Sequence, residues 1–335
     1  MIKEALAALA EGRDLSRDEM TEVMNRIMEG EATPSQIGAF LMGLRVKGET
    51  VAEITGAAQV MRDKAQKIKA PGPCLDTCGT GGDHSLTFNI STGAALAAAG
   101  AGVIVAKHGN RAASSACGSA DVLAALGVNI EAGPEVVETC LDRAGIGFLF
   151  APLLHAAMKH AIGPRREMAM RTIFNVLGPL TNPAGAKRQL LGVFSPDLTE
   201  TLAQVLMNLG SEAALVVHGS DGLDEITLTG PTRVSELKNG KVTTFELTPQ
   251  AAGLKTCAKN DLIGGDPKDN ARILREVLDN KPGPQRDIVA MNAGAAIYAA
   301  GKAENIADGV KLAFEVIARG GAKAKLDELI RITHS

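Results

Sequence analysis

A break rich in proline and glycine at residues 70–73 (Ala-Pro-Gly-Pro) divides this sequence into two parts with different patterns. The part before the break contains helix signals only. Residues 16–19 and 50–53 have the Ser/Thr-x-x-Glu pattern of capping boxes, and Thr33-Pro34 marks a third helix start. Apolar residues then recur at helical spacing after each start. The first part therefore predicts a small all-helical domain over residues 1–70.

Short apolar runs alternate with helix-like segments after the break. The runs at 103–106, 147–150, 190–194 and 214–217 predict buried strands, and the segments 119–126, 134–144 and 198–209 predict helices between them. This alternation predicts an α/β domain over residues 71–335 with helices on the faces of a mostly parallel sheet. A type I′ hairpin at 238–241 (Lys-Asn-Gly-Lys) makes the sheet mixed. We also expect helices from about 165–185 to join the helical domain.

The composition argues against several classes of protein. A formal net charge of −3 gives no general attraction to nucleic acid or to an anionic membrane. Five cysteines without a C-x2-C pair indicate reduced thiols. The apolar stretches are too short to span a bilayer, and the N-terminal one is too short for a signal peptide. We therefore expect a cytoplasmic protein that binds neither nucleic acid nor membrane.

Residues 76–83 (DTCGTGGD) follow an apparent strand and contain three glycines in four positions. Such a turn exposes backbone N–H groups that can surround a phosphate. The segment has no lysine, so it is not a Walker A loop, and His84 stands where a dinucleotide fingerprint needs glycine. The alternative is a tight turn without a ligand.

A polar run at residues 87–92 (TFNIST) precedes an apolar helix predicted at 93–99. Ser91 or Thr92 is a candidate N-cap of that helix. The start of a helix beside a glycine-rich loop is also an anion site, and both interpretations are compatible.

A basic segment at residues 107–111 (KHGNR) follows the predicted strand 103–106, and Ser114, Ser115, Gly118 and Ser119 come after it. Ligands of open α/β sheets bind at the carboxyl ends of strands, where this predicted loop falls. The alternative is a solvated basic loop. We assign His108 no proton-transfer role.

Asp224-Glu225 follow the predicted strand 214–217 and a glycine-containing loop. Adjacent carboxylates suit Mg²⁺, which prefers oxygen ligands shared with substrate phosphates. The alternative is a solvated turn. Asp221 is a weaker candidate that we expect to cap the turn.

These segments together resemble the motifs of the anthranilate phosphoribosyltransferases, and residues 171–183 (RTIFNVLGPLTNP) are similar to a signature of the same family. The resemblance covers essentially the whole chain. It implies a fold like that of the nucleoside phosphorylases and phosphoribosyltransferases, and a homodimer. It also implies transfer of a phosphoribosyl group from phosphoribosyl pyrophosphate to anthranilate in tryptophan biosynthesis, with two Mg²⁺ ions per monomer.

The same resemblance assigns site residues. Lys107 acts electrostatically, and no residue is assigned as an acid or base. Ser91 and Glu225 hold one Mg²⁺, and Asp224 with Glu225 the other. The anthranilate contacts are Gly79, Asn110 and Arg165, with Arg166 as the alternative to Arg165. The phosphoribosyl pyrophosphate contacts are Gly79, Gly82, Asp83, Thr87, Asn89, Ile90, Ser91, Thr92, Lys107, His108, Gly109, Asn110, Arg111, Ser115 and Ser119.

The chain departs from the family pattern at three places. Ala116-Cys117 replaces a common Lys-Ser, Ala156 replaces a common proline, and Gly163-Pro164 shifts the Gly-Pro before the predicted anthranilate arginine. These changes bear on substrate affinity and loop shape. Two other functions stay open: a pyrimidine nucleoside phosphorylase, which shares the fold type, and a non-catalytic paralogue that binds nucleic acid.

Overall fold

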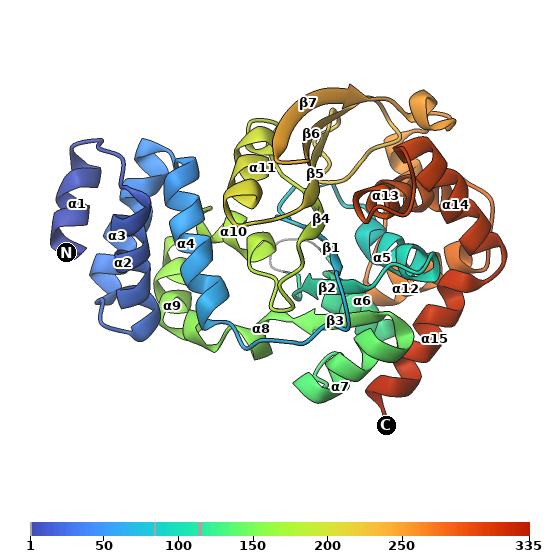
Figure 1. Ribbon diagram of the computed structural model, residues 1–335, viewed down its shortest axis with the longest axis horizontal. Helices are drawn as coiled ribbons and strands as arrows, with labels where there is room; N and C mark the ends of the chain where they lie inside the picture. The colour runs from blue at the N-terminus through green and yellow to red at the C-terminus, as the bar shows by residue number, and fades with distance from the viewer. Residues whose placement is uncertain (1, 84, 113–115) are drawn as a thin grey trace.

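The helical part of the chain forms a bundle at one end of the molecule (Figure 1). The computed structural model describes residues 2–83, 85–112 and 116–335. The bundle contains a helix from the middle of the sequence, because α9 packs against α2 and α3. Its helices are α1 (Ile2–Ala10), α2 (Arg17–Glu29), α3 (Pro34–Lys47), α4 (Val51–Lys64) and α9 (Lys159–Met168).

The three predicted helix starts are confirmed. Ser16, Thr33 and Thr50 are N-caps, and each has the reciprocal contacts of a capping box with the residue three positions later. These contacts satisfy backbone N–H groups that a helix leaves without partners at its start.

A seven-stranded sheet forms the centre of the α/β part, in the order β3-β2-β1-β4-β5-β6-β7. The pairs from β3 to β5 are parallel, and β5-β6-β7 are antiparallel. The mixed, mostly parallel sheet is thus confirmed. The strands are β1 (Leu75–Gly79), β2 (Val105–Gly109), β3 (Ile146–Phe150), β4 (Arg188–Gly192), β5 (Ala213–Gly219), β6 (Thr232–Lys238) and β7 (Lys241–Leu247).

Both faces of the sheet are covered. Leu190, Leu215 and Val217 belong to a core shared with α5, α13 and α14. Leu191 and Val216 belong to a second core that runs through α11 into the helical bundle. The alternation follows from the two-residue period of a strand. The remaining helices are α5 (Ile90–Gly100), α6 (Ser119–Leu126), α7 (Pro134–Thr139), α8 (Ala151–Leu154), α10 (Phe174–Leu177), α11 (Leu198–Asn208), α12 (Pro267–Leu278), α13 (Pro284–Ala299), α14 (Ile306–Ala318) and α15 (Gly321–Thr333).

Several predicted boundaries were wrong by a few residues. The strand expected at 103–106 is β2 and ends at Gly109, and the strand expected at 190–194 is β4 and ends at Gly192. The register with neighbouring strands sets these limits, since Val105–Gly109 pairs with Ile146–Phe150 residue by residue. The helix expected at 134–144 is α7 followed by a wider π-helical turn.

The predicted hairpin turn is confirmed. Asn239 and Gly240 join β6 to β7 with φ values of 53° and 69°, as a type I′ turn requires. Among the described residues, no helix is both long and apolar enough to cross a membrane.

Candidate active site

The glycine-rich segment and the carboxylate pair meet at the carboxyl edge of the sheet. The backbone N–H of Gly81 donates to Asp224 Oδ2 at 2.8 Å. A Cβ on Gly79 would lie 2.6 Å from the same oxygen, so this approach requires glycine. Gly81 and Gly82 have φ values of 66° and 74°, in the left-handed region that glycine adopts without strain. The conformation of the glycine-rich segment is therefore fixed by its contact with Asp224, unlike that of a turn without tertiary contacts.

Residues 76–79, which we expected in the loop, belong to β1. The Asp76 carboxylate is fully buried and accepts hydrogen bonds from the His108 N–H at 3.0 Å and from Asn182 Nδ2 at 2.7 Å. Burial raises the pKa of Asp76, while these donors and the Lys107 charge act in the opposite direction. Asp76 thus links β1 to the backbone of β2 and to Asn182.

Helix α5 begins earlier than predicted. It starts at Ile90, and its N-cap is Asn89, without a side-chain capping bond, rather than Ser91 or Thr92. Ser91 and Thr92 therefore lie in the first turn, where backbone N–H groups and the helix dipole favour an anion. The Thr92 hydroxyl is buried and has no hydrogen-bond partner in the structure.

Lys107 is part of β2 and not of the basic loop that we expected. Its side chain is 3% exposed. Its Nζ donates to the Thr77 carbonyl and lies 3.3 Å from Ser91 Oγ. Burial lowers the pKa of Lys107. Nearby negative groups oppose that shift, and the charge of Asp76 makes the largest opposing contribution. The cation is thus placed beside the start of α5.

His108 points away from this cluster, because successive strand residues face opposite sides of a sheet. Its Nε2 lies 3.2 Å from Nε2 of His155. Burial lowers the pKa of His108 to about 3 and that of His155 to about 4. Two neutral rings then share one hydrogen bond. The side chain of His108 therefore lies on the opposite face of β2 from that of Lys107.

Asp224 and Glu225 lie in the loop after β5, as predicted. Protein surrounds both carboxylates although each residue keeps some contact with solvent. Burial, followed by the charge of Asp83, raises the pKa of Asp224 to about 7. Burial, followed by the charge of Asp224, raises the pKa of Glu225 to about 8, and Glu225 accepts the backbone N–H of Ser91. Asp221 accepts the backbone N–H of Leu223 at 3.3 Å, as expected of a turn cap, and hydroxyl donors from Thr227 and Thr229 further along the same loop.

The remaining predicted contacts occupy neighbouring loops. Asn110 and Arg111 follow β2, and Ser119 starts α6 next to Gly109. Thr87 forms an isolated bridge with Ile263. Ser115 lies outside the described residues.

Asn89 holds two further segments together. Its amide Nδ2 donates to the Cys117 carbonyl at 3.1 Å, and its Oδ1 accepts from Asn270 at 3.0 Å. Cys117, at one of the departures from the family pattern, is buried and its thiol lies 3.3 Å from the same Oδ1. Sequence patterns gave no signal for Asn270, which lies 181 positions from Asn89.

Two arginines from the α9–α10 region differ in their contacts. The guanidinium of Arg165 lies 4.9 Å from the ring centroid of Phe174. Arg171 donates to the carbonyl of Gly82 in the glycine-rich segment. We had not predicted Arg171 as a site residue, although it begins the 171–183 signature.

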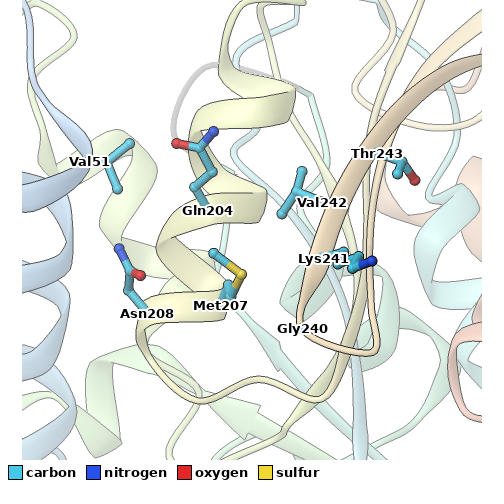
Figure 2. A pocket seen from close by; sticks show the side chains of 8 residues that line it. All are labelled: Val51, Gln204, Met207, Asn208, Gly240, Lys241, Val242 and Thr243. Atoms are coloured by element: carbon cyan, nitrogen blue, oxygen red, sulfur yellow. The ribbon is translucent and has the colours of Figure 1, made fainter.

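A separate open cavity of about 480 Å³ lies between α4, α11 and the β6–β7 turn (Figure 2). Lys241 is the one titratable group among the residues that line it. None of the predicted site residues lines it. Because catalysis of group transfer needs several converging polar groups, the carboxyl edge of the sheet is the stronger candidate.

The chain matches the sequence patterns of two domains. Residues 71–323 match the a/b domain of the glycosyl transferase family, and residues 3–65 match its helical bundle domain. Fold and site thus define a glycosyl transferase with a helical bundle. This fold class agrees with the one predicted.

Individual relatives narrow the class. The chain is 54% identical to anthranilate phosphoribosyltransferase of Acetivibrio thermocellus, over 100% of this chain and 97% of the relative. Identity to the enzyme of Rhodopseudomonas palustris is 56%, over 99% and 98%. The Thermus thermophilus crystal structure of that enzyme superposes with a TM-score of 0.93 at 45% identity, over 99% of each chain. A Saccharomyces cerevisiae structure in complex with PRPP and Mg has a TM-score of 0.90 at 29% identity, over 99% and 98%. The chain belongs to the anthranilate phosphoribosyltransferase family. This membership supports the predicted transferase function and does not support the phosphorylase or the nucleic-acid-binding alternative.

Proposed function

We propose that this chain transfers the phosphoribosyl group of phosphoribosyl pyrophosphate to the amine of anthranilate, a step of tryptophan biosynthesis. The observation that most strongly supports this function is that the glycine-rich segment, Lys107 and the carboxylate pair meet at one edge of the sheet. In this reaction the bond from C1 to pyrophosphate breaks and a bond from C1 to the amine nitrogen forms. Pyrophosphate departs with the electron pair of the broken C1–O bond, and the new ammonium group then releases its proton to solvent.

The leaving pyrophosphate needs stabilisation because negative charge accumulates on it. Backbone N–H groups of the glycine-rich segment and of the first turn of α5 supply part of it, and the Lys107 ammonium supplies a full charge. A preorganised donor of this kind lowers the activation barrier by about 3 kcal/mol. The ribose ring oxygen shares the positive charge that develops at C1, as in glycoside chemistry.

The carboxylate pair fits Mg²⁺. Asp224 and Glu225 are crowded carboxylates with raised pKa values, and a cation between them would relieve their repulsion. In the described residues, no three His, Cys, Asp or Glu side chains are arranged to hold a metal ion on their own. We propose two ions that share ligands with the substrate, one at Ser91 and Glu225 and one at Asp224 and Glu225. Bound Mg²⁺ neutralises charge on the diphosphate.

The acceptor requires orientation more than activation, since an aromatic amine is neutral and nucleophilic at pH 7. Burial lowers the pKa of Arg165, but a guanidinium stays charged at neutral pH. Pairing with the anthranilate carboxylate orients the amine toward C1. Arg165 lies on α9 in the helical bundle, so movement of the bundle toward the sheet would bring it to the acceptor and exclude water.

We further propose a cytoplasmic homodimer. The bundle exposes Met42 and Val46 on α3 and Ile162 on the neighbouring α9, which suits burial against a second copy. The five cysteines are free, as expected in a reducing compartment. Light scattering on the purified chain measures the mass, and a monomer at all concentrations would contradict the dimer.

The test of the function is loss of anthranilate fluorescence in four mixtures, with and without phosphoribosyl pyrophosphate and with and without Mg²⁺. We expect loss only when both are present, with release of one pyrophosphate for each anthranilate consumed. A parallel assay measures phosphorolysis of thymidine and uridine. Phosphorolysis without transfer to anthranilate would contradict the proposal.

A further inference from the structure

Arg171 links the helical region to the glycine-rich segment. It lies between α9 and α10, and its guanidinium donates a hydrogen bond to the carbonyl oxygen of Gly82. The two residues are 89 positions apart in the chain. A Cβ on Gly82 would lie 3.2 Å from Arg171 Nη2, so glycine leaves room for the guanidinium.

The same guanidinium is held in place by an aromatic ring. Its Cζ lies 4.1 Å from the ring centroid of Phe194. The Phe194 backbone N–H in turn donates to Thr80 Oγ1 at 3.1 Å. A planar guanidinium stacked on a ring keeps its N–H donors in a fixed plane. Arg171 therefore contacts the glycine-rich segment directly at Gly82 and, through Phe194, at Thr80.

The contact at Gly82 determines the direction of a backbone donor. Glycine has wide conformational freedom, and Gly81 and Gly82 are consecutive. The C=O and the following N–H of a trans peptide point in opposite directions, so a carbonyl held against Arg171 directs the Asp83 N–H away from it. Asp83 also accepts the backbone N–H of Asp224 at 3.4 Å. The orientation of the Gly82–Asp83 peptide group therefore affects the geometry of both the glycine-rich segment and the carboxylate pair.

We propose that Arg171 is a positioning residue that holds residues 80–83 in the conformation that receives the diphosphate of the donor substrate. It acts through the loop backbone and needs no contact with the reacting atoms. It also connects that loop to α9, which carries Arg165. The proposal rests on the proposed function, because it specifies how the chain orders its diphosphate site.

The test compares Arg171→Ala, Arg171→Lys, Phe194→Leu and the Arg171→Ala/Phe194→Leu double variant with the parent. Arg331→Ala, at an exposed arginine of α15, is the control. For Arg171→Ala we expect the KM for phosphoribosyl pyrophosphate, and the Kd for inorganic pyrophosphate with Mg²⁺ by calorimetry, to rise about tenfold. The kcat and the anthranilate KM should stay within about threefold. Arg171→Lys should recover only part of the loss, since an ammonium reaches the carbonyl but does not stack as a plane.

Two further readouts decide the mechanism. If the Arg171–Phe194 stack and the Arg171–Gly82 hydrogen bond act as one unit, the double variant should lose little more affinity for pyrophosphate than Arg171→Ala alone. Additive losses of affinity would overturn the joint action of the two contacts. Hydrogen exchange of the amides in the 79–83 segment should be faster in substrate-free Arg171→Ala, at unchanged Tm. Unchanged exchange, or an equal rise in both KM values, would overturn the positioning role.

The exchange measurement separates this proposal from the proposed function because it uses no substrate. A parent chain that neither binds pyrophosphate nor consumes anthranilate would contradict the proposed function. The exchange rates of its loop would still show whether Arg171 orders residues 80–83.

Discussion

The backbone N–H of Gly81 donates a hydrogen bond to Asp224 at 2.8 Å, although the two residues are 143 positions apart. This contact joins the loop after β1 to the loop after β5. It places a cluster of backbone donors against a pair of carboxylates, which is the arrangement that a diphosphate with bound Mg²⁺ requires.

Gly192→Ala should disrupt the carboxylate pair. A Cβ at this position would lie 1.6 Å from the carbonyl oxygen of Asp224, so the loop backbone must move. We expect the Mg²⁺ concentration for half-maximal turnover to rise at least about tenfold. Gly38→Ala in α3 is the control, since a Cβ there meets nothing within 4 Å. Equal Mg²⁺ dependence in both variants would contradict the geometry.

Lys107→Met should lower kcat about 100-fold, because it removes a buried cation beside the start of α5. The substitution also leaves Asp76 without its nearby charge, so circular dichroism must show that the variant is folded. Lys311→Met at an exposed lysine of α14 serves as the control. A folded Lys107→Met variant with kcat within threefold of the parent would rule out the electrostatic role.

Arg165→Ala should raise the KM for anthranilate at least about tenfold while the KM for phosphoribosyl pyrophosphate changes by less than about twofold. The neighbouring Arg166 is exposed, and Arg166→Ala should change neither constant by more than about twofold if Arg165 is the acceptor contact. Steady-state kinetics with each substrate varied supply both constants. An equal rise in the two KM values, or a larger effect from Arg166, would mean that the acceptor is bound elsewhere.

His155→Gln should make the chain relatively more stable as the pH falls. Burial lowers the pKa of His155 to about 4, whereas an unfolded histidine has a pKa of about 6.5. Between these values the unfolded parent binds a proton that the folded parent does not, so His155 destabilises the fold increasingly as the pH falls through 6.5. Glutamine keeps an N–H donor for His108 and does not titrate.

Urea unfolding at pH 7.5, 6.5, 5.5 and 5.0 measures this effect. The unfolding free energy of His155→Gln minus that of the parent should rise by about 1.4 kcal/mol for each pH unit below 6.5. His334→Gln, which replaces an exposed histidine, is the matched control substitution. Parallel pH curves for His155→Gln and the parent would show that the folded His155 titrates normally.

Local signals predicted the helices and the edge of the sheet where the site lies. The cap residues Ser16, Thr33 and Thr50 satisfy donors within their own turn, so no distant partner is needed to place α2, α3 and α4. The location of the site at this edge could be predicted because parallel strands direct their carboxyl ends to one side of the sheet.

The errors arise where distant residues stabilise a polar group. Lys107 and His108 were expected in a loop because they are polar, but Asp76 and His155 allow them to be buried within β2. Asn89 rather than Ser91 occupies the N-cap position of α5, and Ser91 instead faces Lys107. The Arg171 contact joins two irregular segments, for which no periodic pattern exists in the sequence.

The most direct test of the single diphosphate–metal site is the Mg²⁺ dependence of turnover in an Asp224→Asn/Glu225→Gln double variant. Both substitutions keep the side-chain size and remove the two negative charges. Glu246→Gln on the exposed surface of β7 is the matched control. We predict that the double variant loses Mg²⁺-dependent anthranilate consumption by at least about 100-fold while the control keeps it. A double variant with unchanged Mg²⁺ dependence would contradict the account.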